Sequence, residues 1–318
     1  MRKIHNPSPD LIMLAAKTLI QGNLVAFPTE TVYGLGANAS NHNAVKRIYA
    51  VKSRPPSHPL IIHISSIEKI GGWATKIPDY ALKLSENFWP GPMTLILKRS
   101  SLAKNFITGN QEIVGIRVPA HPIATLLLAK FEQIGGFGVV APSANKFGAV
   151  SPTTAEHVYD ELGPNLAKED VILNGGQCQI GIESTIIDCT GIKPNILRPG
   201  YITNTQINKL INSNIQNSGG VNSIKVPGNF KSHYKPKTKI VISGKVQPGD
   251  GFFALKSSAT PKGVFRLAEP SNINEFGKLL YGAFRLADKM LVNRIFIEIP
   301  EGAEFLDAIN DRIKKAMH

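Results

Sequence analysis

The sequence predicts an α/β fold in two parts. Short apolar runs alternate along the chain with segments that carry helix caps and helical apolar spacing. The chain has 318 residues, 42% of them hydrophobic, which suffices for more than one core. From about 212 to 236 the composition turns to Asn, Ser, Gly and Pro, as in a linker. We therefore expect a mixed-sheet domain at 1–211, a linker at 212–236 and a small α/β domain at 237–318.

The first domain begins with helix, strand and helix. Ser8 is a good N-cap, Pro9 suits a first helical turn, and Gly22 can end that helix. A strand follows at 24–27. Asn41 can cap the next helix, which must end before Pro55.

The remaining elements follow from apolar runs and turn residues. Thr153-x-x-Glu156 predicts a capping box for a helix that Gly163 ends. Strands of the first domain are expected at 60–64, 94–97, 113–118, 137–141, 171–173, 184–188 and 196–198. The second domain should contain strands at 239–242, 251–255 and 294–298, a helix at about 272–291 and a C-terminal helix.

The charge, the cysteines and the lack of long apolar runs limit the kinds of function this protein can have. The net charge is +13, from 36 basic and 23 acidic residues, and it favours phosphate-bearing partners or simply solubility. Nucleic acid, nucleotide and membrane surface all remain open. Cys178 and Cys189 lack metal-ligand spacing, so we expect buried packing residues and no metal site. With no long apolar run and no apolar signal core, we expect a cytoplasmic protein with no membrane segment.

The stretch from Phe27 to Ala39 indicates a polar site at the end of a strand. We expect Gly34 and Gly36 to form a turn that lets Thr31 and Tyr33 face a ligand. Their spacing loosely fits a dinucleotide fingerprint, but residues 51–56 are basic where that fingerprint needs an acidic residue. An anionic ligand is expected there instead.

Two cations followed by two prolines carry the strongest charge signal. Lys52 and Arg54 can clamp a polyphosphate, Arg as a planar fork and Lys as a point charge. Alternatively, they are solvated cations at a helix C-terminus. Because a Walker loop is absent, a bound nucleotide would depend on such side chains, with Mg²⁺ bridging its phosphates.

Other polar residues interrupt or follow the apolar strands, and each has a structural alternative. His63 is either a ligand contact or a core histidine. Arg117 would suit a substrate carboxylate or an internal salt bridge. Ser143, Asn145 and Ser151 also fit turns and caps, and no Gly-x-Ser-x-Gly elbow suggests a nucleophilic serine. Several polar clusters at the strand ends of one sheet indicate a ligand site.

Taken in order, these clusters resemble the Sua5/YrdC/YciO family of threonylcarbamoyl-AMP synthases, and they span most of residues 10–205. The linker piece Pro227-Gly228 with His233-Tyr234-x-Pro236 is similar to the two-domain Sua5 form. The matching stretches are Pro28-Thr29-Glu30-Thr31-Val32-Tyr33-Gly34-Leu35, Lys52-x-Arg54-Pro55, Pro59-Leu60-Ile61-x-His63, Trp89-Pro90-Gly91-Pro92-Met93-Thr94, Gly115-Ile116-Arg117-Val118-Pro119, Ala141-Pro142-Ser143-Ala144-Asn145, Glu183-Ser184-Thr185-Ile186-Ile187-Asp188 and Leu197-Arg198-Pro199-Gly200.

The resemblance implies a YrdC-like twisted open mixed sheet with helices, a small Rossmann-like α/β C-terminal domain and a defined reaction. L-Threonine, bicarbonate or CO₂, and ATP with its Mg²⁺ would give threonylcarbamoyl-AMP and pyrophosphate, the first step toward the t6A base beside the tRNA anticodon. It further implies that the product passes transiently to the t6A transferase. An RNA-binding regulator and a nucleotide-sensing module remain alternatives, and weak RNA binding would suit the charge.

The resemblance also assigns residues, though no general base. Threonine would be held by Thr31, His63, Arg117, the Ala141 backbone and Ser184. ATP would be held by Lys52, Arg54, His58, the backbone near Ile113, Ser143, Asn145, Ser151, Arg198 and Tyr234. Tyr234 would make the linker a lid, although Asn229-Phe230-Lys231-Ser232 departs from the family's pattern there.

Overall fold

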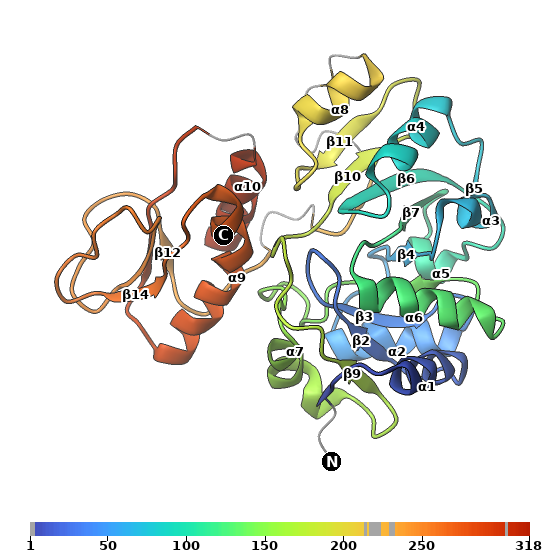
Figure 1. The fold of residues 1–318 in the computed structure, drawn as a ribbon, viewed down its shortest axis with the longest axis horizontal. Helices are drawn as coiled ribbons and strands as arrows, with labels where there is room; N and C mark the ends of the chain where they lie inside the picture. The colour runs from blue at the N-terminus through green and yellow to red at the C-terminus, as the bar shows by residue number, and fades with distance from the viewer. Residues whose placement is uncertain (1–3, 213–214, 216–223, 229–232, 303–304) are drawn as a thin grey trace.

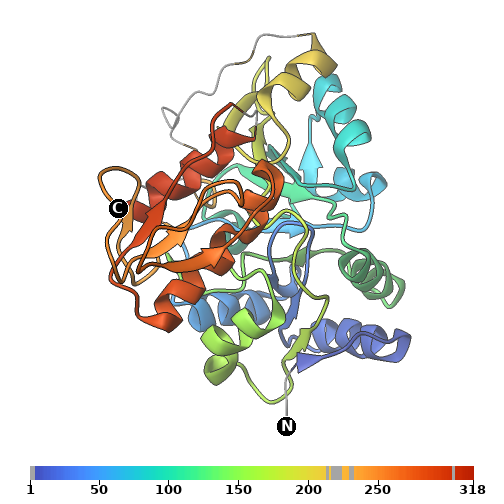
Figure 2. The same ribbon diagram turned by 60° about the vertical axis from the view of Figure 1, so that its left-hand side comes forward.

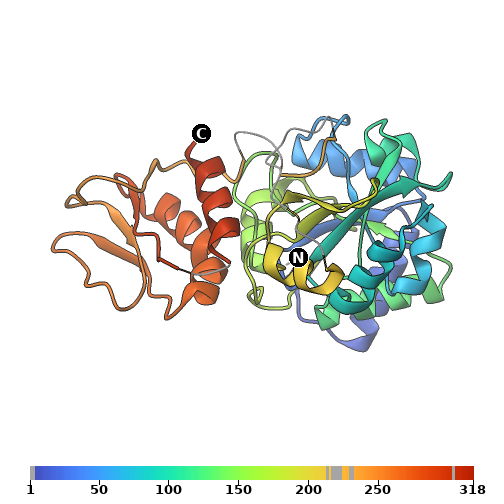
Figure 3. The same ribbon diagram turned by 90° about the horizontal axis from the view of Figure 1, so that it is seen from above.

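The chain forms two α/β domains, each with its own sheet (Figure 1). The computed structural model describes residues 4–212, 215, 224–228, 233–302 and 305–318. We call the part from β1 to α8 the N-terminal domain and the part from β12 to α10 the C-terminal domain. Two helices of the C-terminal domain, α9 (Ile273–Met290) and α10 (Leu306–Met317), lie on the side that faces the N-terminal domain (Figures 1 and 3).

The sheet of the N-terminal domain is mixed, as predicted. Its order is β1-β9-β2-β3-β8-β4-β7-β6-β10-β11, with β5 paired to β6. The pairs β4–β7 and β6–β10 are parallel, whereas β2–β3, β3–β8 and β6–β7 are antiparallel. The strands are β1 (Ile4–His5), β2 (Val25–Phe27), β3 (Gly34–Asn38), β4 (Ile61–His63), β5 (Ala74–Thr75), β6 (Met93–Arg99), β7 (Ile113–Arg117), β8 (Val139–Val140), β9 (Val171–Leu173), β10 (Thr185–Asp188) and β11 (Asn195–Arg198).

Helices cover both faces of this sheet because its strands are apolar on both sides. Val25 and Phe27 pack with α1 and α6, whereas Leu24 and Ala26 belong to the larger core on the opposite face. The helices are α1 (Pro9–Ile20), α2 (His42–Lys52), α3 (Ile70–Trp73), α4 (Asp79–Phe88), α5 (Asn105–Thr108), α6 (Pro122–Gln133), α7 (Ala155–Leu162) and α8 (Asn204–Ile211), with short 3₁₀ turns at Ile67–Lys69 and Gly163–Asn165.

The C-terminal domain has a four-stranded parallel sheet. Its order is β12-β15-β13-β14. Parallel pairing requires crossover connections, and the 18-residue helix α9 supplies one between β14 and β15. Figure 2 shows this domain in front, in orange and red. Its strands are β12 (Ile240–Val241), β13 (Gly251–Phe253), β14 (Phe265–Ala268) and β15 (Ile295–Ile297).

Helix caps decide which predicted boundaries hold. The side chains of Ser8 and Asn41 accept hydrogen bonds from the amides of the first turns of α1 and α2, which confirms both starts. The capping box predicted at Thr153 is wrong by one residue, because Thr154 is the N-cap of α7 and bonds the amide of His157. Cys178 and Cys189 are buried, as expected.

The glycine turn predicted after β2 is wrong. Gly34 and Gly36 lie inside β3, which pairs antiparallel with β2. A β-carbon on Gly36 would lie 2.8 Å from a ring carbon of Phe27 and 3.0 Å from the carbonyl oxygen of Val25. The glycine is therefore required by close packing. Tyr33 points into the core and donates its hydroxyl to the carbonyl of Gly176 at 2.8 Å, so it does not face a ligand as predicted.

Candidate functional site

A cavity lies where several strands of the large sheet end and the linker crosses them. Its walls contain side-chain hydroxyl groups, stretches of backbone and three arginines, together with two aromatic residues of the linker. The lining residues are Thr31, Val32, Arg54, Ile61, His63, Arg117, Ala141, Pro142, Ser143, Glu183, Ser184, Arg198, Pro227, Gly228, His233 and Tyr234. Every residue expected to contact threonine is among them. Of the residues expected to contact ATP, Arg54, Ser143, Arg198 and Tyr234 line the cavity.

Arg54 is a buried cation in the cavity wall. It follows α2, whose C-cap Ser53 is left-handed, and only 6% of its surface is exposed. Its Nη2 donates to the carbonyl of Pro59 at 2.9 Å, and burial lowers its pKa to about 10. A buried guanidinium with spare donors requires an anion. The alternative of a solvated helix end is wrong for Arg54 and also for Lys52, which is 1% exposed.

Lys52 contacts the loop beside the cavity. Its Nζ donates to the carbonyl of Ser143 at 2.5 Å and to that of Asn145. Burial first, then the charge of Arg54, lowers the pKa of Lys52 well below its usual value. In this arrangement the ammonium fixes the polar loop after β8 and is not itself part of the cavity wall.

Arg117 forms the internal salt bridge that the sequence left open. Its Nη2 lies 2.6 Å from Oε1 of Glu30, and both side chains are buried. The second carboxylate oxygen of Glu30 accepts the amide of Ala120 at 3.0 Å. The ion pair fixes the guanidinium at the end of β7, where it still lines the cavity. Sequence analysis did not identify Glu30 as a partner, because the two residues are distant in the chain.

His63 is a neutral imidazole in the cavity wall. It ends β4, is 3% exposed and meets the ring of Phe27 edge-on at 6.2 Å. Burial, and then the charge of Arg117, lowers its pKa to about 3. His63 therefore offers hydrogen bonds without charge near neutral pH.

Arg198 connects the sheet to the linker. Its Nε and Nη2 donate to the carbonyl of Ser184 at 3.0 and 2.8 Å, and its Nη1 donates to the carbonyl of Pro227 at 3.0 Å. The hydroxyls of Ser184 and Thr94 share a hydrogen bond of 2.7 Å. These contacts set the positions of β10, β11 and the linker relative to one another.

Tyr234 closes the cavity from the linker. It is fully buried, and its ring stacks on Tyr281 of the C-terminal domain at 5.6 Å between centroids. Among the described residues its hydroxyl has no hydrogen-bond partner. The neighbouring His233, which is not among the predicted site residues, also lines the cavity, and burial lowers its pKa to about 3. Residues 229–232, where the sequence differs from the family's pattern, lie outside the described residues.

The remaining predicted residues lie around the cavity. His58 meets the ring of Phe147 at 4.9 Å, and Ile113 lines a neighbouring groove with Lys225 and Val226 of the linker. Asn145 donates its side-chain amide to the carbonyls of Lys146 and Ala149. Ser151 donates its hydroxyl to Glu183, a cavity residue that sequence analysis did not select.

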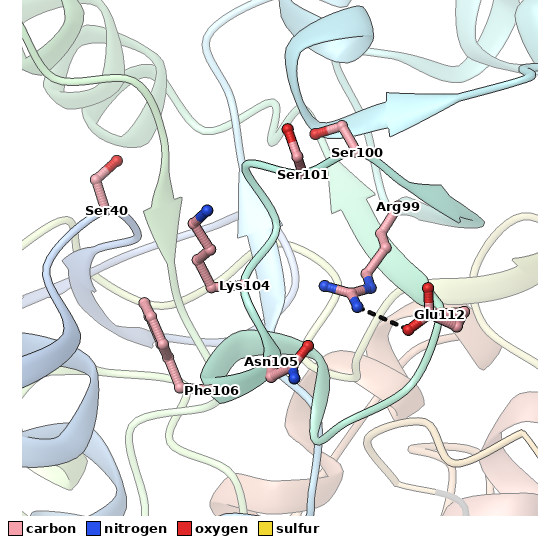
Figure 4. A pocket seen from close by; sticks show the side chains of 8 residues that line it. All are labelled: Ser40, Arg99, Ser100, Ser101, Lys104, Asn105, Phe106 and Glu112. Atoms are coloured by element: carbon pink, nitrogen blue, oxygen red, sulfur yellow. Dashed lines mark hydrogen bonds and ion pairs between the residues drawn. The ribbon is translucent and has the colours of Figure 1, made fainter.

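Another depression, on the surface, lies apart from this cavity (Figure 4). Arg99 and Glu112 form an ion pair there at 2.7 Å. None of the predicted site residues lines it; its walls are Ser40, Arg99, Ser100, Ser101, Lys104, Asn105, Phe106 and Glu112. Over the described part of the chain, no three His, Cys, Asp or Glu side chains are grouped to hold a metal ion. No helix within the described ranges is long and apolar enough to span a membrane.

The fold and the cavity define a two-domain α/β protein with a cavity, lined by buried arginines and hydroxyl groups, at the strand ends of its larger sheet. A family model described as Telomere recombination, for Sua5, YciO and YrdC proteins, matches residues 17–200. A second, described as Threonylcarbamoyl-AMP synthase, C-terminal domain, matches residues 202–317. The chain belongs to the Sua5/YrdC/YciO family, in its two-domain Sua5 form.

Individual relatives agree with this assignment. The threonylcarbamoyl-AMP synthase of Pyrococcus abyssi is 37% identical over 96% of this chain and 93% of its own length. That of Bacillus subtilis is 42% identical over 73% of this chain and 66% of its own length. The crystal structure of P. abyssi Sua5 complexed with L-threonine superimposes with a TM-score of 0.88 at 36% identity, covering 99% of this chain and 97% of that one.

Proposed function

We propose that this protein is a threonylcarbamoyl-AMP synthase. It converts L-threonine, bicarbonate or CO₂, and ATP to threonylcarbamoyl-AMP and pyrophosphate, the first step of t6A synthesis. The observation that supports this most is the convergence of Thr31, His63, Arg117, Ala141 and Ser184 on one cavity that Arg54 and Arg198 also line. A relative that is similar over nearly the whole chain carries this enzyme name.

The reaction needs alignment and charge neutralisation more than a covalent protein group. The threonine amine attacks the carbon of CO₂ and loses a proton, giving a carbamate. A carbamate oxygen then attacks the α-phosphorus, and the bond to the β-phosphate oxygen breaks to release pyrophosphate. Both reactants are anions, so fixed cations and hydrogen-bond donors lower the barrier.

In the threonine site, we propose that Arg117 binds the substrate carboxylate. Its salt bridge with Glu30 holds the guanidinium still, so little order is lost on binding. The neutral His63 and the hydroxyls of Thr31 and Ser184 offer hydrogen bonds for the amine and side chain of threonine.

In the ATP site, we propose that Arg54 and Arg198 neutralise the phosphates, because both are buried cations in the same wall. Lys52 completes the clamp by fixing the loop of Ser143 and Asn145 through their carbonyls. Tyr234 closes over the nucleotide. Further contacts come from Ser151, His58 and the backbone at Ile113. Mg²⁺ arrives with ATP as part of the substrate.

Four further proposals concern the domain boundaries, the location of the protein, the recipient of its product and RNA binding. We retain the domain boundaries 1–211, 212–236 and 237–318, supported by Ile207 of α8, which packs into the core of the N-terminal domain. We place the protein in the cytoplasm. Its product passes transiently to the t6A transferase, with weak RNA binding favoured by the charge of +13.

Pyrophosphate release tests the function. The protein is incubated with ATP and bicarbonate, with and without L-threonine, and pyrophosphate is measured. The synthase releases it only when threonine is present. An RNA-binding regulator or a nucleotide sensor would bind its ligand without threonine-dependent release, and that result would refute the proposal.

A further inference from the structure

The C-terminal domain contributes a fully buried arginine to the wall behind the cavity. Arg312 of α10 is 0% exposed, and its Nε lies 2.8 Å from Oε2 of Glu183 in the N-terminal domain. Its Nη2 donates to the carbonyl of Pro199 at 3.0 Å. A buried ion pair between domains stabilises a fold less than a well-packed apolar contact would. The pair is therefore better explained by a role in positioning Glu183 than by a contribution to stability.

Glu183 connects this arginine to the proposed substrate sites. It directly precedes Ser184, and its carboxylate accepts the hydroxyl of Ser151 at 2.5 Å. The same carboxylate accepts the hydroxyl of Tyr281, from α9, at 3.0 Å. Burial alone would raise the pKa of Glu183, but the charges of Arg312 and Arg198 and the hydrogen bonds from Ser151 and Arg312 bring it to about 2. Glu183 is therefore ionised and fixed by the C-terminal domain.

The lid tyrosine is held by the same two residues. The guanidinium carbon of Arg312 lies 5.3 Å from the ring centroid of Tyr234, and the ring of Tyr281 stacks on Tyr234 at 5.6 Å. The backbone amide of His233 donates to the carbonyl of Lys315, also in α10. One helix pair therefore contacts both the lid and the segment that carries Ser184.

Gly181 allows α9 to approach the backbone of the N-terminal domain just before Glu183. Its φ is +82°, and a β-carbon there would lie 2.5 Å from the α-carbon of Lys278 in α9. Glycine thus meets both requirements, the left-handed backbone and the close approach of a helix.

We propose that Arg312 and Tyr281 are positioning residues for synthesis, which orient Ser184 and Ser151 through Glu183 and hold Tyr234 over the nucleotide. The C-terminal domain then completes the active site as well as anchoring the lid. The inference rests on the proposed function, because its readout is the synthase reaction. Displacing substrate-aligning groups by about 1 Å can lower turnover about 100-fold without unfolding the protein.

The test is a double-mutant cycle on the full chain with Arg312→Gln, Glu183→Gln and the double variant, scored as threonine-dependent pyrophosphate release. We expect each single variant to lose about 100-fold in kcat/KM, and the double variant to lose no more than the worse single one. Additive losses would refute action through Glu183. A wild-type enzyme without activity would refute the proposed function instead, so the two failures are distinguishable.

Arg285→Gln is the matched control. Arg285 lies in α9, and like Arg312 of α10 it pairs with a glutamate of the N-terminal domain, Glu161, at 2.5 Å. It also donates to the backbone carbonyl of Val150, but no ion pair or hydrogen bond joins it to Glu183. It should keep wild-type kcat/KM. If Arg285→Gln loses as much as Arg312→Gln, the effect is domain docking and the inference is wrong.

If Arg312→Gln does not fold, Tyr281→Phe tests whether the C-terminal domain acts through Glu183. This variant removes only the hydroxyl that Glu183 accepts and keeps the ring that stacks on Tyr234. We expect KM for threonine to rise about tenfold, the change that loss of one hydrogen bond produces. The same loss should lower the thermal midpoint by only about 2–4 °C, so the variant stays folded. Wild-type kinetics in Tyr281→Phe would overturn the role of the Glu183 network.

Discussion

The hydroxyl of Tyr234 lies against Gly228, so closely that a β-carbon at position 228 would come within 2.3 Å of it. Gly228 also has a φ of +80°, which other residues adopt only with strain. Two linker residues are therefore in close contact at the cavity, and the position of the Tyr234 hydroxyl requires a residue without a β-carbon at position 228.

Gly228→Ala should displace Tyr234 and reduce synthesis. We expect kcat/KM for ATP to fall by about 100-fold, because the lid no longer closes. The measurement is threonine-dependent pyrophosphate release across ATP concentrations. Gly244→Ala is the control: its φ is +91°, but nothing lies within 4 Å of the added carbon. Equal losses in the two variants would mean that backbone strain, not Tyr234, is responsible.

Arg54→Ala should abolish synthesis. The variant removes a buried guanidinium from the cavity wall, and loss of one such charged donor costs about 100-fold or more in rate. Saturation of pyrophosphate release with ATP checks this, and the thermal midpoint checks the fold. Arg99→Ala, in the separate surface depression, should behave as wild type (Figure 4). Unchanged rates in Arg54→Ala would refute the phosphate clamp.

Gly36→Ala should destabilise the protein without changing substrate affinity. The added carbon would press on Phe27 and Val139 inside the sheet, and such overpacking costs about 1–3 kcal/mol. Chemical unfolding and the two KM values are measured together. Gly71→Ala is the control, because its added carbon meets nothing within 4 Å. A raised KM with normal stability would restore Gly36 to the ligand site.

Stability should fall as pH drops below about 6.5, because the folded protein holds His63 neutral. Its folded pKa of about 3 lies below its ordinary 6.5, so the unfolded chain binds a proton that the folded chain refuses. This contribution is fully present above pH 6.5 and is lost toward pH 3, at about 1.4 kcal/mol per pH unit.

Unfolding midpoints between about pH 7 and about pH 5 measure this loss. His63→Asn should reduce the slope by the share of one histidine, about 1.4 kcal/mol per pH unit, and leave the share of His233, whose pKa burial also lowers to about 3. His5→Asn, at an exposed position, should leave the slope as it is in the wild type. An equally steep slope in His63→Asn would assign the loss to other groups.

The parts of the fold that depend on local chemistry could be predicted from the sequence. Ser8 and Asn41 start their helices by bonding amides three residues on, and both starts follow from the local sequence. The helices α4 and α6 were not predicted, although Pro122 in the first turn of α6 was a usable signal. The two-residue strand β8 is short enough that only its neighbours in the sheet define it.

The site was predictable where residue types matched family motifs, and not where partners are distant in sequence. Tyr33 had the same polar surroundings as Thr31, but its hydroxyl bonds Gly176, far along the chain. The pairing of Glu183 with Arg312 likewise joins two domains, and no periodicity in either segment indicates it. Such contacts follow from tertiary packing alone.

The most direct measurement is the incorporation of labelled carbon from bicarbonate into an adenylate. The protein is incubated with labelled bicarbonate, ATP and L-threonine, and the products are separated and identified by mass spectrometry. We predict labelled threonylcarbamoyl-AMP and an equal amount of pyrophosphate, with neither formed when threonine is left out. Pyrophosphate without a labelled adenylate, or no threonine dependence, would contradict the account.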